Sequence, residues 1–156
     1  MIELVKPTLG DIPQMMELVE EEVKNGTILH RSADEIATNI RSYIVAKEDD
    51  TILAYGALHI HSSKLAEIRS LIVSKEHRGK SLGSKIVQSA ISEAKHLGLE
   101  EILVLTYLPQ FFTRLGFSEI SKESIPNHKI WADCIKCIHF PVCNEISLMY
   151  KLDSTK

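Results

Sequence analysis

The stretch EIRSLIVSKEHRGKSLGSKIVQSAISEAKHL, from Glu67 to Leu97, decides the fold of this chain. Its first part, Ile68 to Val73, is a short apolar run rich in β-branched residues and predicts a mostly buried strand. Its last part repeats apolar residues at the spacing of one helical face, and Gly98 follows where a helix commonly ends. The apolar positions of this predicted helix are Leu82, Ile86, Val87, Ala90, Ile91, Ala94 and Leu97.

Between the predicted strand and helix lies a loop of small residues, Arg78 to Gly83, that opens directly into the helix. Unpaired N–H groups and the positive end of the dipole at a helix N-terminus favour an anion such as a phosphate or pyrophosphate. Gly79 and Gly83 would let such a ligand approach the backbone closely, and Arg78 adds a positive charge. The loop lacks the Gly-Lys-Ser/Thr ending of nucleoside triphosphatases.

An arginine at the start of the loop and a glycine at its sixth position resemble the R/Q-x-x-G-x-G/A loop of the GCN5-related N-acetyltransferases (the GNAT family). Ser81 stands where that family usually has its first glycine. The resemblance implies acetyl-CoA as cosubstrate, bound by the end of the strand, the loop and the start of the helix. The residues expected to bind it are Leu71, Ile72, Val73, Arg78, Gly79, Lys80, Ser81, Leu82, Gly83, Ser84 and Phe112.

The remaining elements predict an α/β (α+β) fold with the order βααβββαβαββ, which is the order of that family. A helix is expected to begin after Asp11, and Ser32 to Glu35 has the pattern of a capping box for a second helix through Ile40. Asp49-Asp50 indicates a hairpin turn. The resemblance implies a mixed, mostly antiparallel sheet that is splayed at the acetyl-CoA site. The expected strands are 2–8, 43–46, 52–58, 67–73, 102–106, 117–121 and 145–152, with a short helix at 109–115.

Composition narrows the classes of function. The 156 residues, with 44% hydrophobic and 25% charged residues, predict one globular domain over residues 1–156. A formal charge of −3 without a basic cluster argues against nucleic acid, and no apolar run approaches the roughly 20 residues of a membrane span. The beginning of the chain lacks a signal-peptide pattern, so the cytoplasm is the expected location, and three cysteines, an odd number, argue against a disulfide framework. A homodimer is considered as a partner state.

Four further matches resemble the acetyltransferase domain of the N-acetylglutamate synthases: residues 26–32, Glu67, residues 103–106 and residues 111–117. Residues 129–134 and the Cys-x-x-Cys that follows resemble its short, single-domain relatives, without the amino-acid-kinase domain of the long enzymes. The resemblance implies direct acetyl transfer, in a ternary complex, to the α-amino group of a small amino acid, with L-glutamate and arginine biosynthesis favoured. Two alternatives stay open: acetylation of another amine (another amino acid, a protein N-terminus or a polyamine), and a non-catalytic acyl-CoA sensor.

The same resemblance assigns roles to individual residues. Arg31 would grip the α-carboxylate of the acceptor, for which a guanidinium is well suited. Glu67 would be the general base and Thr106 would donate a hydrogen bond to the leaving thiolate. The acceptor site is completed by Arg69, Ser70 and Lys129.

Three features depart from the simplest assignment. Phe112 stands where many of these enzymes carry a tyrosine general acid, and Tyr107 is a weak candidate for that role. His59 and His61 alternate along a predicted strand and are expected to be polar residues of one face, not ligands. Cys134, Cys137, His139 and Cys143 are residue types of a zinc site, but one Cys-x-x-Cys with a lone cysteine is not the paired signature, so reduced thiols without metal are expected and zinc stays an alternative.

Overall fold

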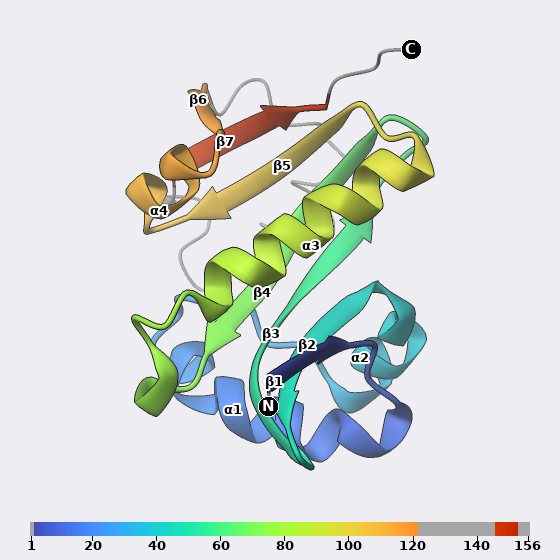
Figure 1. Cartoon of the computed structure of the whole chain (residues 1–156), viewed down its shortest axis with the longest axis vertical. Coiled ribbons are helices and arrows are strands. Elements are labelled where there is room, and N and C mark those ends of the chain that lie inside the picture. The colour runs from blue at the N-terminus through green and yellow to red at the C-terminus, as the bar shows by residue number, and fades with distance from the viewer. Residues whose placement is uncertain (1, 122–145, 153–156) are drawn as a thin grey trace.

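The structure is a computed structural model that describes residues 2–121 and 146–152. The order of its elements, apart from three short 3₁₀ turns, is the predicted one (Figure 1). The elements are β1 (Ile2–Val5), α1 (Ile12–Lys24), α2 (Ala33–Thr38), β2 (Tyr43–Glu48), β3 (Thr51–Ile60), β4 (Leu65–Val73), α3 (Leu82–Leu97), β5 (Glu101–Thr106), α4 (Pro109–Arg114), β6 (Ser118–Ile120) and β7 (Ile146–Lys151).

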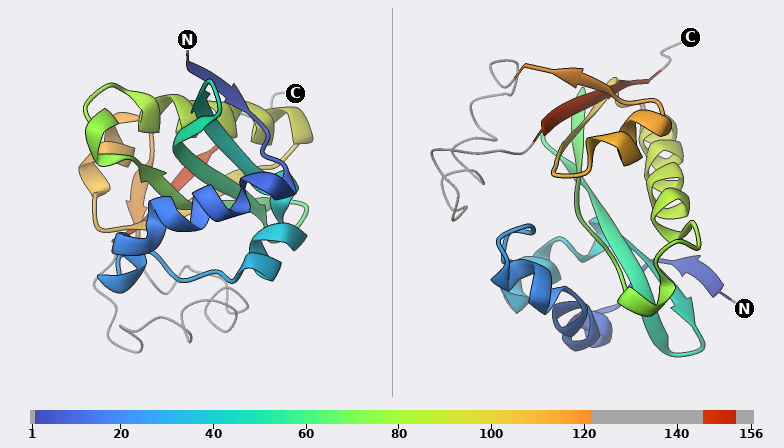
Figure 2. Two further views of the ribbon diagram at one scale, coloured as in Figure 1. Left: turned by 90° about the horizontal axis from the view of Figure 1, so that it is seen from below. Right: turned by 90° about the vertical axis from the view of Figure 1, so that its left-hand side faces the viewer.

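The strands form one twisted sheet in the order β1-β2-β3-β4-β5-β7-β6. Among these strands only β4 and β5 run parallel, and the helix α3 makes the crossover that a parallel pair requires. Figures 1 and 2 show α3 across one face of the sheet, and α1 with α2 on the other. The fold is therefore the mixed, mostly antiparallel α/β architecture that the sequence predicts.

Helix α3 follows the predicted periodicity closely. Its first six apolar positions are buried, whereas Leu97 at its last position is 51% exposed. Gly98 ends the helix with φ of 86°, in the left-handed region where glycine is least strained. The apolar stripe packs on the central strands and so fixes the N-terminus of α3 beside the end of β4.

Strands β4 and β5 pair over a short distance only. Their register joins Leu65 with Glu101, Ala66 with Ile102, and Glu67 with Leu103. Beyond that last pair β4 continues to Val73 and β5 to Thr106, with no further pairing between them among the described residues. The two central strands therefore diverge within the sheet, as the predicted splay requires.

The start of the chain differs from expectation. Strand β1 ends at Val5, and a 3₁₀ turn over Leu9–Asp11 precedes α1. The Asp11 side chain makes no capping bond to α1. One carboxylate oxygen of Asp11 instead accepts the N–H of Thr8 at 2.8 Å, and the other accepts the ammonium of Lys47 at 2.8 Å. This carboxylate thus ties the entry of α1 to strand β2. The predicted capping box is confirmed at Ser32 and Glu35, although α2 ends at Thr38.

Replacement of Asp11 by Asn should lower the free energy of unfolding at pH 7 by about 1.5–3 kcal/mol, the usual range for a hydrogen bond to a charged group. Burial acts to raise the pKa of Asp11, but hydrogen bonds from Lys47 and Thr8 outweigh it and hold the pKa below its usual value. Because the pKa of Asp11 is lower in the folded state, its carboxylate stabilises the fold at pH values above the unfolded-state pKa of 3.8. This contribution is lost as the pH falls through the folded-state pKa.

Urea unfolding of the native chain and of Asp11→Asn at pH 7 and pH 3 tests this expectation. The difference between the two proteins should shrink at pH 3, because this pH lies below the unfolded value of 3.8 and the carboxyl of the unfolded native chain binds a proton there. Glu17→Gln, on the exposed side of α1, is the control and should leave stability unchanged at both pH values. An equal difference at both pH values would show that charge plays no part at Asp11.

Candidate active site

A cavity of about 710 Å³ opens where β4 and β5 diverge. Its wall is built by the loop after α1, strand β4, the loop and first turn of α3, the end of β5, and α4. A cavity of this size accommodates a ligand of several hundred daltons. The predicted site residues that line it are Arg31, Glu67, Arg69, Ser70, Leu71, Ile72, Val73, Arg78, Gly79, Ser81, Leu82, Gly83, Ser84, Thr106 and Phe112.

Two predicted residues are not placed on this wall. Lys80 is exposed and does not line the cavity, so its place among the acetyl-CoA-binding residues stays a prediction. Lys129 lies outside the described residues, as do the zinc candidates Cys134, Cys137, His139 and Cys143. Within residues 2–121 and 146–152, no group of three or more His, Cys, Asp or Glu side chains is arranged to hold a metal ion.

The loop before α3 contains two residues with left-handed backbone. Gly79 has φ of 83° and Ser81 has φ of 67°, so both residues are in the left-handed region. Apart from its chain neighbours, no atom of the described residues lies within 4 Å of the position of a Gly79 Cβ, so backbone conformation and not space favours glycine there. Ser81 adopts the same region at a cost of order 1–3 kcal/mol. This conformation explains why the family usually has glycine at this position.

The structure gives Gly83 a packing role, while the close approach of a ligand to this glycine stays a prediction. A Cβ at Gly83 would lie 3.3 Å from Cζ of Phe111 and 3.6 Å from Cγ2 of Val73. This glycine therefore lets the ring of Phe111, from α4, approach the first turn of α3. Close ligand approach was the predicted reason, and side-chain packing is the one that the structure shows.

Arg78 is anchored at the edge of the cavity. Its Nε donates to the carbonyl of Val73 at 3.1 Å, and its terminal Nη2 lies 3.6 Å from Oε2 of Glu22. The other carboxylate oxygen of Glu22 accepts the hydroxyl of Thr27 at 2.6 Å. One carboxylate at the end of α1 thus contacts both the anion-binding loop and the loop that leads to Arg31.

Strand β4 carries a bulge at the cavity. Arg69 pairs with Ala57 and Ile72 with Tyr55, so Ser70 and Leu71 both stand opposite Gly56. Ser70 has φ of 60°, and a Cβ at Gly56 would lie only 3.0 Å from Cγ2 of Ile86. Because a bulge interrupts the hydrogen-bond ladder and bends its strand, it re-aims the peptide groups of β4 beside the cavity.

Glu67 is the most deeply buried acidic side chain of this wall. It is 2% exposed, and its Oε1 lies 2.9 Å from Nε2 of His61. The sequence predicts that the strand begins at Glu67, which would make this residue an exposed strand end. In the structure β4 begins two residues earlier, at Leu65. Glu67 consequently lies inside the strand, between His59 of β3 and Leu103 of β5.

Thr106 lies on the same wall, three positions beyond the residue that pairs with Glu67. At 3.2–3.4 Å per residue this is a separation of about 10 Å along β5. The hydroxyl oxygen of Thr106 accepts the N–H of Leu108 at 2.8 Å. Its hydroxyl hydrogen is not used by that bond and can donate to a ligand.

Positive charge gathers at the side of the cavity nearest α1 and α2. Arg31 and Arg69 both line the cavity, and Nη2 of Arg69 donates to Nδ1 of His59 at 2.9 Å. Burial raises the pKa of the nearby Tyr43 hydroxyl against the charges of both arginines. Burial therefore keeps the Tyr43 hydroxyl neutral beside the two guanidinium groups.

Phe112 is part of the aromatic core and also lines the cavity. It is 4% exposed, and its ring centroid lies 4.9 Å from that of Phe111 and 5.4 Å from that of Phe117. Phe112 has no proton to donate, whereas Tyr107 lines the cavity. The contact between His61 and Glu67 is the main feature that the sequence did not predict. The sign of this contact in the sequence is the His-x-His alternation. That pattern indicates the contact only when the register of β3 with β4 is known.

Comparison with known proteins agrees with the fold. The chain matches the acetyltransferase (GNAT) family over residues 12–117. An uncharacterized N-acetyltransferase from Chlorobaculum tepidum is 36% identical over 144 residues, which are 92% of each chain. An amino-acid acetyltransferase from Pasteurella multocida is 29% identical over 124 residues, which are 78% of this chain but only 28% of that protein.

Solved structures show the same fold at lower identity. The N-acetylglutamate synthase from Neisseria gonorrhoeae, complexed with coenzyme A and N-acetyl-glutamate, superposes with a TM-score of 0.87 at 21% identity, over 98% of this chain and 35% of that one. A Mycobacterium tuberculosis protein in complex with CoA gives a TM-score of 0.82 at 22% identity, over 97% of this chain and 99% of that one. No helix in the described part of the chain is both long and apolar enough to cross a membrane. By its matched residues, its relatives and its fold, the chain belongs to the acetyltransferase (GNAT) family, as an acetyl-CoA-dependent N-acetyltransferase.

Proposed function

We propose that this enzyme, as a single cytoplasmic domain, acetylates the α-amino group of a free amino acid, with L-glutamate as the preferred acceptor and arginine biosynthesis as its setting. The observation that carries the proposal is the joint placement of Arg31, Arg69 and Glu67 on one cavity wall. Two guanidinium groups suit a carboxylate, and a buried glutamate beside them suits a base for the adjacent amine. Relatives named amino-acid acetyltransferases support the same class of acceptor.

The anion-binding loop fits the donor. The N–H groups at the start of α3 and the side chain of Arg78 would hold the phosphates of acetyl-CoA. The apolar wall, including Leu71, Val73 and Phe111, would contact the rest of the cosubstrate. Bound acetyl-CoA supplies a thioester carbonyl that is open to attack by an amine.

The acceptor would lie on the side of Arg31. A two-bond fork from its guanidinium to the α-carboxylate fixes both the position and the direction of the neighbouring amine. Arg69 and Ser70 border the same place, and Lys129 is assigned to the acidic side chain of the acceptor from the sequence alone.

The chemistry then needs few groups. Glu67 would accept a proton from the acceptor ammonium, directly or through water. Peptide N–H groups of the bulge at Ser70 and Leu71 are candidates to stabilise the oxyanion, and the Thr106 hydroxyl can donate to the departing thiolate. Much of the rate enhancement would come from holding amine and carbonyl together.

Glu67→Gln should lower kcat by roughly 10²–10⁴-fold, the range for loss of a general base, with little change in either KM. The loss should be largest at low pH, where the acceptor amine is most fully protonated. Steady-state rates of thiol release between pH 6 and pH 9 measure this. Glu100→Gln, an exposed glutamate before β5, is the matched control. A kcat within a few-fold of the native value would place the base elsewhere. Absence of turnover by the native protein would instead favour the sensor alternative.

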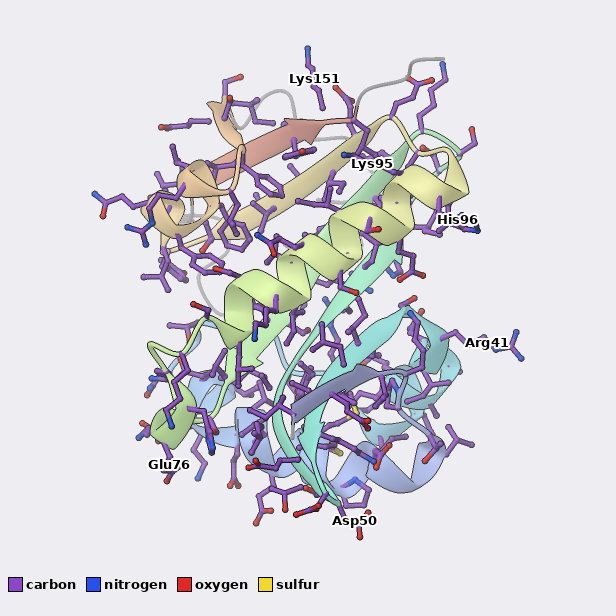
Figure 3. The ribbon with its side chains drawn as sticks, in the orientation of Figure 1. Arg41, Asp50, Glu76, Lys95, His96 and Lys151 are labelled. Carbon is purple, nitrogen blue, oxygen red and sulfur yellow. The ribbon has the colours of Figure 1, made fainter. Side chains whose placement is uncertain are left out.

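Arg31→Ala should raise the KM for the amino acid by about 10–100-fold, since a charge-assisted bond contributes about 1.5–3 kcal/mol, and should spare the KM for acetyl-CoA. Arg31→Lys should recover little, because an ammonium cannot form the two-bond fork. Arg41→Ala, an exposed arginine that does not line the cavity and extends outward from the protein (Figure 3), is the control. Unchanged acceptor kinetics for Arg31→Ala would contradict the proposed acceptor site.

A screen of native enzyme against all amino acids and against representative polyamines and peptides tests acceptor class. L-glutamate should give the highest kcat/KM. Lys129→Ala should reduce the preference for glutamate over glutamine by about tenfold or more, because one charge-assisted bond is lost. Activity on peptides or polyamines alone would support the other-amine alternative and remove Arg31 from the acceptor site.

A further inference from the structure

Two histidines near the end of β3 stand behind the cavity wall. His59 and His61 do not line the cavity, but each bonds to a residue that does. Nε2 of His61 lies 2.9 Å from Oε1 of Glu67, and Nδ1 of His59 accepts Nη2 of Arg69 at 2.9 Å. The histidine pair, His59 with His61, thus contacts two of the charged groups that the proposed reaction uses, Glu67 and Arg69.

The register of the hairpin explains this arrangement. His59 pairs with Glu67, and Ala57 with Arg69, so the two histidines and their two partners all lie on one face. Each histidine bonds to its diagonal neighbour on β4 and not to the residue directly opposite, a reach that long side chains allow. Alternation along both strands therefore produces two parallel contacts, one to an anion and one to a cation.

The chemistry of the partners fixes the ring protons. A guanidinium only donates, so Nδ1 of His59 carries a lone pair and its ring is neutral, with the hydrogen on Nε2. An ionised carboxylate only accepts, so Nε2 of His61 carries the hydrogen that it shares with Glu67. One ring thus presents an acceptor to a cation, and the other presents a donor to an anion.

The pair is also held rigidly. The side chain of His61 is 4% exposed and that of Glu67 is 3% exposed. The two rings contact edge to face, with centroids 4.8 Å apart and an interplanar angle of 75°. Two rings in edge-to-face contact, one of them buried, have little rotamer freedom, so the atoms bonded to them are restricted in turn.

We propose that the histidine pair consists of positioning residues, His61 orienting the carboxylate of Glu67 and His59 orienting the guanidinium of Arg69. This inference rests on the proposed function, in which Glu67 is the base and Arg69 borders the acceptor. The edge-to-face contact of the two rings therefore relates the position of the base to that of the guanidinium which borders the acceptor. His61 should therefore control kcat, and His59 should control the KM for the acceptor.

The test compares His61→Phe, His61→Gln and His59→Phe in the native enzyme, with His61→Phe repeated in a Glu67→Gln background. Phenylalanine keeps the ring contact but removes the polar bond, and glutamine restores an N–H donor to the carboxylate. His96→Phe, on the solvent side of α3 (Figure 3), is the matched control. Rates, both KM values and the melting temperature are measured for every variant.

His61→Phe should lower kcat about 10–100-fold, since misplacement of a catalytic group by 1 Å costs on that order, with the KM for acetyl-CoA unchanged. His61→Gln should recover most of the rate. In the Glu67→Gln background, His61→Phe should cause no further loss, because the group that it positions is already gone. His59→Phe should raise the KM for the acceptor severalfold and leave kcat within a few-fold.

Other results decide against the inference in distinct ways. If His61→Phe lowers kcat by the same factor in both backgrounds and also lowers the melting temperature, the role of His61 is purely structural and the inference is overturned. A native kcat for His61→Phe would also overturn it while leaving Glu67 as the base. If Glu67→Gln itself keeps the native kcat, the proposed base is wrong and the inference falls with it. Should His61→Phe not fold, the same comparison is made with His61→Gln and His61→Asn, and the proposal fails if the poorer donor geometry of asparagine leaves kcat unchanged.

Discussion

The divergence of β4 from β5 is the constraint on which the rest of the site depends. These strands are parallel in an otherwise antiparallel sheet, and their register ends at Glu67 and Leu103. A parallel pair needs a crossover, and here α3 supplies it, so the N-terminus of a long helix lies beside the point of separation. The covalent path of the chain therefore joins an anion-binding helix end to a gap between two strands. Glu67 occupies the last paired position before that gap.

Two glycines next to large side chains shape the wall of this gap. Gly56 lets Ile86 and Leu71 come within contact of β3 beside the bulge. Gly83 does the same for the ring of Phe111 at the start of α3. The aromatic residues of α4 then continue into the core through Phe112 and Phe117. Packing at two glycines thus connects the cavity wall to the core on the α3 face of the sheet.

Local patterns in the sequence predicted most of the fold and much of the site. The apolar stripe of α3, the capping box at Ser32 and the acetyl-CoA loop all depend on residues close together in the chain. The missed features depend on the register between strands. Neither the burial of Glu67 nor its contact with His61 follows from periodicity, because a shift of one residue in β3 would move His61 to the other face. The packing role of Gly83 likewise requires the position of Phe111, 28 residues further along the chain.

The separation of the two central strands also has a thermodynamic consequence. Beyond Glu67 and Leu103, each strand presents to the gap a row of peptide groups that the described strands do not pair, so the sheet contains two internal edges. Such edges are the part of a sheet that opens most easily, and local opening exposes amide hydrogens to exchange with solvent. A bound molecule that fills the gap raises the stability of the whole domain by mass action. Occupancy of this cavity and stability of the sheet are therefore linked. The free energy needed to separate the two halves of the domain rises with ligand concentration.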